Sequence, residues 1–212
     1  MFRNTAYRLS MANRNEASRL SILDATLRLL ADENMTMKSL SIEAIAKEAG
    51  VGKTTIYRWW PSKAAVVVDA FMENHLVHTP VRTDVSVPEA LALHLRSLIH
   101  QYAGPAGRLV SQLLAESQYD PETLAMFRER FFDNRYWTII ELVQRGVDNG
   151  ELSPALDARI VSEMLYAPVY HRLLIGHRPL DDQFADDLIA TVLELGAAKP
   201  TTRSRTSRRR AA

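Results

Sequence analysis

The chain has 212 residues, 47% of them hydrophobic, no cysteine and a formal net charge of +1. This composition is globular rather than disordered, and the length suits one large or two small domains. The lack of cysteine excludes disulfides and thiolate metal sites, and no apolar run approaches the roughly 18 residues of a membrane span. The N-terminus has no apolar signal core, so we expect a soluble cytoplasmic protein with no membrane partner.

Although the net charge is small, positive and negative residues are unevenly distributed along the chain. Residues 1–63 hold 10 Lys and Arg against 6 Asp and Glu, which gives +4. Residues 64–198 carry −9, and residues 199–212 carry +6 without a single acid. Attraction to phosphate is therefore concentrated at the two ends, whereas DNA would repel the middle.

Residues 1–15 show no helical period and contain three arginines. We expect a flexible arm, and such arms can reach DNA grooves or phosphates. A start codon assigned too early, at Met1 instead of Met11, explains the same stretch equally well.

A first helix is predicted over residues 16–33. Its apolar stripe consists of Leu20, Leu23, Leu27 and Leu30. Leucines at this spacing usually form core, so we expect them to pack against the elements that follow.

Residues 41–63 are predicted to form two short helices joined by a tight turn. Ser41 can cap the first helix, whose apolar face is Ile42, Ile45, Ala46 and Ala49. Gly50 can adopt the left-handed conformation that ends a helix. The second helix, residues 53–60, stops at Pro61. Two helices with a short glycine-containing turn are typical of a helix-turn-helix.

The second of these helices is predicted to present a DNA-binding surface. It exposes Lys53, Thr54, Thr55, Tyr57 and Arg58. Side chains of these types contact phosphates and base edges. We therefore expect this helix to enter the major groove of double-stranded DNA.

Gly52-Lys53-Thr54 also looks like the end of a nucleotide-binding P-loop. That pattern needs a glycine five residues earlier and a preceding strand. Position 47 is lysine and the preceding segment has a helical pattern, so we reject this reading.

Residues 45–63 resemble the DNA-binding signature of the TetR family of bacterial transcriptional regulators. The resemblance is carried by Ile45-Ala46, Ala49-Gly50-Val51, Thr55-Ile56-Tyr57, Trp60 and Lys63. The specific pattern covers about residues 19–70, and beyond it only architecture and length match. Asn34 stands where the family commonly has Gly, and Gly52 where it often has Ser.

The resemblance implies two groups of DNA contacts. Contacts to the DNA backbone are expected from Thr55, Tyr57, Trp59 and Lys63. Contacts to bases are expected from Lys53, Thr54 and Arg58. Ser41 and Gly52 complete the predicted DNA-binding set. The resemblance also implies that Trp60 is buried against the first helix and that residues 16–63 form the DNA-binding domain.

Residues 64–196 are predicted to form a helical regulatory domain. An apolar helix over residues 64–74, which in the family links the two domains, is followed by a loop over residues 75–87. Further helices are predicted over residues 88–102, 106–117, 121–149, 157–175 and 181–195. Proline at position 168 predicts a kink or break. No segment alternates with a strand's period, so we predict an all-α protein of about nine helices, with an N-terminal three-helix helix-turn-helix domain and a C-terminal ligand-binding and dimerisation domain.

The last two predicted helices each carry an apolar stripe. Stripes of this kind more often form the protomer's own core. The family resemblance instead implies a homodimer held by a four-helix bundle, and a helix-turn-helix on a two-fold operator also requires a dimer. The predicted interface residues are Ile160, Met164, Phe184, Leu188, Val192 and Leu195.

No catalytic or metal-binding arrangement is evident. His75 and His78 have i, i+3 spacing but no clear third ligand, so we predict no metal site. Hydrolase, metalloprotease and dinucleotide motifs are all missing from the sequence. We predict neither an enzyme nor a cofactor.

The helical domain could enclose a pocket for a small-molecule effector. Candidate lining residues are Phe127, Phe131, Trp137, Tyr166 and Tyr170, with His100 or His171 as polar groups. Each aromatic residue alone is more often core than ligand contact. The family usually has a pocket in this domain, which favours the ligand-binding interpretation.

We therefore predict a nucleoid-associated bacterial repressor that binds a palindromic operator as a homodimer and is released by a small molecule. An all-α scaffold that no longer binds DNA stays open as an alternative, because the N-terminal charge is only +4. Residues 197–212 are predicted to be disordered, and their arginines could contact phosphates or act only to solubilise the chain.

Overall fold

The computed structural model describes the backbone of residues 2–32 and 34–197, and the side chains of residues 15–32, 34–74 and 78–195. Over these residues the chain forms ten α-helices and one π-helix, with no strand. The π-helix joins α7 to α8 in one rod, so that the separate helical rods match the predicted number. None of the helices described has the length and apolar character needed to cross a membrane. The predicted basic tail lies outside the described residues, apart from the backbone of residue 197.

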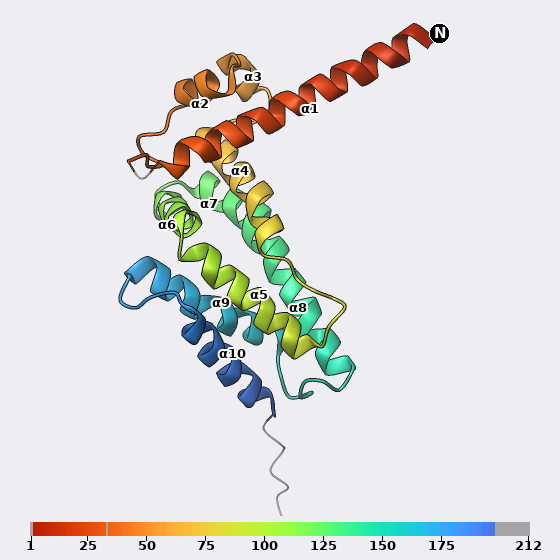
Figure 1. The fold of residues 1–212 in the computed structure, drawn as a ribbon, viewed down its shortest axis with the longest axis vertical. Coiled ribbons are helices and arrows are strands. Elements are labelled where there is room, and N and C mark those ends of the chain that lie inside the picture. Colours follow the sequence, from red (N-terminus) through yellow and green to blue (C-terminus); the bar gives the residue numbers. More distant parts are fainter. Residues whose placement is uncertain (1, 33, 198–212) are drawn as a thin grey trace, which may run out of the picture.

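Four helices build the N-terminal end of the molecule (Figure 1). They are α1 (Phe2–Ala31), α2 (Ile42–Ala49), α3 (Lys53–Tyr57) and α4 (Lys63–His78). α2 and α3 lie across α1, and α4 leads from them into the second domain.

The first helix begins much earlier than expected. α1 starts at Phe2, so the prediction of an arm without helical structure over residues 1–15 is wrong for the backbone of residues 2–15. The physical reason is that residues 2–31 contain no glycine or proline, and nothing in that stretch ends a helix.

The predicted leucine stripe of α1 is only partly correct. Leu23 and Leu30 are buried, but Leu20 is 44% exposed. The buried face of α1, which packs against α2 and α4, instead contains Ile22 and Thr26, both fully buried. Leu20 lies on a different side of the helix and is therefore exposed.

The second domain consists of six α-helices and the π-helix. They are α5 (Val87–Tyr102), α6 (Pro105–Ser117), α7 (Pro121–Phe127), the π-helix (Arg128–Phe132), α8 (Asp133–Asp148), α9 (Ala158–Ile175) and α10 (Asp182–Ala197). α5 is the central helix, packed against α6, α8, α9 and α10, and it buries Leu91, Leu95, Leu98, Ile99 and Tyr102. α9 and α10 lie together on one side of α5 (Figure 1).

Two predicted helices differ in detail from those observed. The single helix expected over residues 121–149 contains the π-helical turn, whose wider backbone changes which side chains face inward. The break expected at Pro168 is absent, because α9 continues from Ala158 to Ile175. Packing of α9 against α5, α6, α8 and α10 offsets the loss of one backbone hydrogen bond at the proline.

Candidate functional site

The turn between α2 and α3 is fixed by local hydrogen bonds. Ser41 Oγ accepts from the backbone N–H of Ala44 at 3.1 Å and caps α2 as predicted. Gly50 has φ 67°, and the N–H of Val51 donates to the carbonyl of Ala46 at 3.0 Å. This is the glycine-terminated helix end expected from the sequence, and it sets the direction in which α3 leaves the turn.

α3 presents most of the predicted DNA-contacting side chains to solvent. Ile56 is fully buried and anchors the helix, whereas Tyr57 is 54% exposed. The other exposed members of the set are Gly52, Lys53, Thr54, Arg58 and Trp59, while Ser41, Thr55 and Lys63 are half-buried. α3 ends at Tyr57 instead of residue 60, because the N–H of Trp59 bonds the carbonyl of Ile56 at 2.9 Å and tightens the last turn.

Two cationic side chains, Lys53 of α3 and Arg58 directly after it, contact neighbouring helices. Lys53 Nζ lies 2.8 Å from Glu43 Oε1 of α2, and this hydrogen bond raises the pKa of Lys53. Arg58 donates to Asn15 Oδ1 of α1 at 3.3 Å, and its guanidinium carbon lies 5.9 Å from the ring centroid of Trp59. Both contacts are exposed, so phosphates can compete for the same cations.

Lys63 has a role that the sequence did not suggest. It is the first residue of α4, and its ammonium donates to the backbone carbonyl of Met37 in the α1–α2 loop. The N–H of Met37 in turn donates to Gln112 Oε1 of α6 at 2.7 Å. Lys63 and Gln112 therefore tie this loop to α4 and to the second domain.

Trp60 is buried as expected, with 1% exposure, and it makes a second link to α4. Its indole N–H donates to Asp69 Oδ2 at 2.7 Å. The other carboxylate oxygen, Oδ1, accepts from Arg130 Nη1 at 2.7 Å. Asp69 therefore joins the turn that follows α3 to the π-helix.

The π-helix contacts α4 a second time through aromatic rings. The centroids of Phe71 in α4 and Phe131 lie 5.2 Å apart, and those of Phe131 and Phe127 lie 4.9 Å apart. Phe131 is also part of a cavity wall. The same short segment thus faces both the connecting helix and the cavity.

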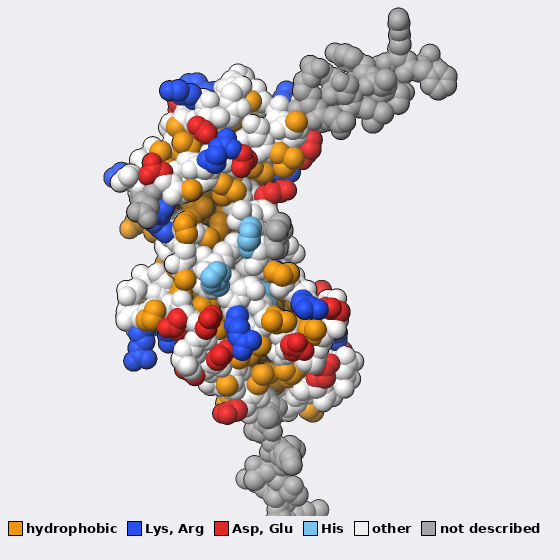
Figure 2. All heavy atoms as spheres, viewed as in Figure 1, with side chains coloured by type: hydrophobic (Ala, Val, Ile, Leu, Met, Phe, Trp, Pro, Cys, Tyr) orange, Lys and Arg blue, Asp and Glu red, His pale blue; other side chains and the backbone are white. Residues whose placement is uncertain are grey.

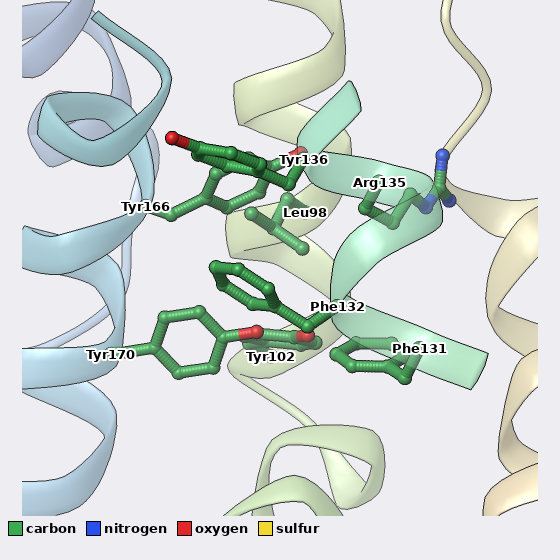
Figure 3. A pocket seen from close by; sticks show the side chains of 8 residues that line it. All are labelled: Leu98, Tyr102, Phe131, Phe132, Arg135, Tyr136, Tyr166 and Tyr170. Carbon is green, nitrogen blue, oxygen red and sulfur yellow. The ribbon is translucent and has the colours of Figure 1, made fainter. Parts of the chain in front are cut away.

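This cavity lies between α5, α8, α9 and the π-helix (Figure 3). It is lined by Leu98, Tyr102, Phe131, Phe132, Arg135, Tyr136, Tyr166 and Tyr170. The volume that the centre of a water molecule can occupy is about 10 Å³, which is room for about one water. The ring of Phe132 lies between Tyr166 on one side and Tyr102 and Tyr170 on the other (Figure 3).

Three of the seven candidate pocket residues, Phe131, Tyr166 and Tyr170, line this cavity. The other four, which include the exposed His171, do not. Phe127 is 4% exposed and packs behind Phe131, and Trp137 is 49% exposed beside the guanidinium of Arg159. Phe127 lies in α7, which contributes no residue to the cavity, whereas Trp137 lies on the outward flank of α8. Helical spacing alone does not determine which flank of a helix meets the cavity.

His100 instead lines an open surface groove between α4, α5 and α10. The residues of this groove are His78, Arg96, Ser97, His100, Gln101 and Asp182. In Figure 2 histidine side chains are visible near the middle of the molecule, below the N-terminal helices. His100 therefore lies outside the aromatic cavity.

Sequence reasoning missed the cation of the cavity. Arg135 is only 8% exposed and donates to the hydroxyl of Thr79, which directly follows α4. Burial lowers the pKa of Arg135. An arginine in a helix usually faces solvent. The one signal in the sequence was that Arg135 stands among aromatic residues.

The polar neighbours of Arg135 are neutral at physiological pH. Burial, followed by the charge of Arg135, lowers the pKa of His94 to about 4, and His94 Nε2 lies 2.9 Å from the hydroxyl of Tyr166. Burial raises the pKa of Tyr170 to about 12 and also raises that of Tyr166. The guanidinium is therefore the main charge at this site.

The predicted dimer residues separate into two groups. Phe184 and Val192 are 7% and 2% exposed, so they belong to the core of the protomer and their assignment to the interface is wrong. They face α5 and α9, against which α10 packs. Ile160 and Leu195 are 52% and 56% exposed, and Met164 and Leu188 are half-buried.

α9 carries the longer exposed apolar stripe. It runs through Ile160, Met164, Ala167 and Leu174, with His171 between the last two on the same face. This spacing of four and three residues keeps the stripe on one side of the helix. Ile175, 65% exposed, extends the surface at the end of α9.

Comparison with known families identifies both parts of the chain. The sequence model described as "Bacterial regulatory proteins, tetR family" matches residues 22–70. A second, described as "Tetracyclin repressor-like, C-terminal domain", matches residues 85–192. Together these matches cover the helix-turn-helix and the helical domain that contains the cavity.

Individual relatives match over most of their length. The chain is 29% identical over 191 residues to the HTH-type transcriptional regulator YdeS of Bacillus subtilis (strain 168), covering 90% of this chain and 96% of YdeS. It is 31% identical over 173 residues to the HTH-type regulator Rv1556 of Mycobacterium tuberculosis, covering 81% of this chain and 84% of the relative. Both relatives are described as uncharacterized.

Solved structures agree with these matches. The TetR family transcription regulator SCO0332 superposes with a TM-score of 0.75 at 29% identity, covering 86% of this chain and 99% of that one. The regulator FadR from Bacillus subtilis, solved in complex with stearoyl-CoA, has the same fold with a TM-score of 0.65 at 18% identity, covering 82% and 97% of the two chains.

Proposed function

The chain belongs to the TetR family of DNA-binding transcriptional regulators, and from this premise we propose that it is a homodimeric repressor of a palindromic operator, released by a small molecule in the regulatory domain. Its relatives are regulators and not enzymes. The observation that carries the proposal is the exposed face of α3, which is held in place by Gly50, the buried Ile56 and Trp60.

α3 has the exposure and the chemistry needed to read a major groove. Lys53, Thr54 and Arg58 are exposed and supply the donors that recognise base edges. Tyr57 and Trp59 lie on the exposed surface of the same turn and suit contacts with the DNA backbone. The matching twofold arrangement of a palindrome requires a second copy of this helix.

Replacement of Arg58 by alanine is expected to weaken operator binding by about 1–3 kcal/mol, provided that the guanidinium reads a guanine. Binding to random DNA should change much less. Fluorescence anisotropy with operator and scrambled duplexes measures both values.

Lys63→Ala serves as the comparison for Arg58→Ala. It should lower affinity for operator and scrambled DNA alike, and the loss of its bond to Met37 should lower the melting temperature as well. If both variants lost the same affinity for the operator and for the scrambled duplex, the assignment of Arg58 to base recognition would be contradicted.

The exposed stripe of α9 supports a homodimer built from α9 and α10 of each protomer. Ile160→Asp is expected to convert the dimer to a monomer, because two copies of the carboxylate would lose water in the apolar interface. Leu124→Asp is a matched control, since Leu124 is 38% exposed but lies on α7, away from this stripe. Light scattering after gel filtration measures the mass of each variant, and a dimeric Ile160→Asp protein would exclude this face as the interface.

The cavity and the π-helix support regulation by a ligand. Phe131 and Phe132 belong to the cavity wall, and the adjacent Arg130 is bound to Asp69 of α4. A molecule larger than one water must displace these rings, and a displaced π-helix changes its contacts with α4. The likeness to FadR, solved with stearoyl-CoA, adds that a domain of this fold can hold a ligand. Release then requires that the ligand binds the DNA-incompetent form more tightly.

Selection of bound duplexes from a random DNA pool tests the proposed function directly. Recovery of a short palindrome with the purified full chain would support a dimeric, sequence-specific regulator. Steep loss of the bound fraction with added salt would accompany it, because phosphate contacts release counterions. Failure to recover any motif at low salt with folded protein would contradict the proposal.

A further inference from the structure

We propose that the effector of the regulatory domain is an uncharged molecule with a planar aromatic ring, and that this ring takes the place of the Phe132 ring in the cavity. This inference rests on the proposed function, because it names the chemical class of the small molecule that the cavity takes. It is carried by the position of Phe132 among other aromatic rings and by the direction of the Arg135 side chain.

The ring of Phe132 lies inside the aromatic cavity and is surrounded by other rings. Figure 3 shows it between Tyr166 on one side and Tyr102 and Tyr170 on the other. Its centroid lies 5.4 Å from that of the Tyr136 ring, with an angle of 18° between the two planes, so the two rings are stacked. Rings at this distance attract each other beyond the effect of burial alone. The surroundings of Phe132 therefore fit a flat aromatic ring.

A ligand can enter this cavity only by displacing a side chain, because the cavity has room for about one water. Phe132 is half-buried, whereas Phe131 is 2% exposed and packs against Phe71 and Phe127. Phe132 is also the last residue of the π-helix, a type of turn that is frequent at functional sites. Of the two neighbouring phenylalanines, Phe132 is thus the one that a ligand replaces.

The charge of the wall excludes an ionic ligand. Among the described residues of the wall, Arg135 alone carries a charge, because burial raises the pKa of Tyr102, Tyr166 and Tyr170. The Arg135 guanidinium is turned away from the rings, toward the loop after α4, where it donates to Thr79 (Figure 3). An anion among the rings would lose its water without gaining a cationic partner, and a cation would meet no carboxylate there. An uncharged ring has neither penalty.

Replacement of the Phe132 ring also changes a contact with α4. Phe132 directly follows Phe131 in the π-helix, and the ring centroid of Phe131 lies 5.2 Å from that of Phe71 in α4. Movement of Phe132 out of the cavity shifts the backbone that it shares with Phe131. Occupation of the cavity and rearrangement at α4 are thus one event.

Four single-ring probes of similar size test the inference on the full-length protein. They are benzyl alcohol, cyclohexylmethanol, benzoate and benzylammonium, which separate the effect of planarity from that of charge. Ligand-observed NMR titration should give benzyl alcohol a dissociation constant about 2- to 10-fold lower than that of cyclohexylmethanol, because ring stacking adds to burial. A featureless apolar cavity would reverse this order, since cyclohexylmethanol is the more hydrophobic of the two. Benzoate and benzylammonium should bind at least about 10-fold more weakly than benzyl alcohol.

Replacement of Phe132 shows whether the ligand takes its place. Phe132→Ala removes the competing ring and should lower the dissociation constant of benzyl alcohol by about 10-fold or more, because the site no longer has to open first. Phe132→Leu removes the flat ring but keeps part of its volume, so it should lower the constant by a smaller factor. This variant also serves as the test if the alanine variant does not fold. Arg128→Gln changes an exposed side chain of the same π-helix and should leave all four constants unchanged.

Four outcomes would overturn the inference. They are binding of cyclohexylmethanol as tight as that of benzyl alcohol, tighter binding of either charged probe, an unchanged constant for benzyl alcohol in the Phe132 variants, and no binding of any probe. The DNA selection described above decides the proposed function independently. A chain that selects a palindrome but fails the probe test would be a regulator whose effector belongs to another chemical class.

Discussion

Replacement of Trp60 by alanine is expected to lower the free energy of unfolding of the DNA-binding end by about 3–5 kcal/mol, because it empties a large volume of a close-packed core. Trp60 is 1% exposed. The substitution also leaves the carboxylate of Asp69 without the indole N–H that donates to it. Since this core sets the position of α3, specific binding to operator DNA should be lost with it.

The neighbouring tryptophan is a matched control. Trp59 is 38% exposed, and its ring lies 6.4 Å from that of Trp60. Trp59→Ala removes the same atoms from a partly solvated position and should lower the free energy of unfolding by about 1 kcal/mol or less. Urea titrations followed by circular dichroism compare the two variants, and losses of equal size would contradict the division into an anchoring and a surface tryptophan.

Replacement of Asp69 by alanine is expected to act on stability and on regulation together. The buried indole N–H of Trp60 would lose its acceptor, which costs about 1–3 kcal/mol. Arg130 would lose its contact with α4 at the same time. The protein should therefore melt earlier, bind operator DNA more weakly and respond less to any effector.

Arg130→Gln separates the two functions of Asp69. It removes the link to the π-helix and keeps the bond from Trp60 to Asp69 Oδ2. Operator affinity without effector should stay close to the wild-type value, because the exposed ion pair adds little to stability. The concentration of effector that releases half of the DNA should rise several-fold, because the ion pair between the π-helix and α4 is missing.

The decisive measurement is a double-mutant cycle on effector-induced release. If Asp69 and Arg130 act through one contact, the double variant should release DNA no differently from Asp69→Ala. Additive effects of the two replacements would show that these residues act separately. Arg128→Gln serves as the control here as well, since Arg128 lies in the same π-helix without a described ion pair.

Much of the local structure could be predicted from the sequence because it is determined by residues close together in the chain. The Ser41 cap and the left-handed Gly50 follow from the pattern of residues 41–63, whereas the burial of Trp60 was implied by the family resemblance, and the structure confirms all three. The stops at Gly150 and Gly176 follow from the same rule. The start of α1 at Phe2 did not follow, because the expectation relied on apolar period and gave too little weight to the lack of helix-breaking residues.

Residue placement around the cavity could not be predicted with the same success. The long helix expected over residues 121–149 contains one π-helical turn, and this wider turn alters which side chains follow each other around the rod. Trp137 is 49% exposed, whereas Arg135, two residues earlier, is buried and its side chain forms part of the cavity wall. A regular helical wheel cannot reproduce such a change.

The sequence by itself determined most of the helices and the helix-turn-helix, because capping, turn chemistry and apolar period act within a few residues. The family followed from the resemblance of residues 45–63 to a known motif. The tertiary structure alone decided which faces meet. It placed Phe184 and Val192 in the core while leaving Ile160 exposed, and it brought Asp69 between Trp60 and Arg130. These contacts join residues that are far apart in the chain, and only the packing of the helices against each other brings them within bonding distance.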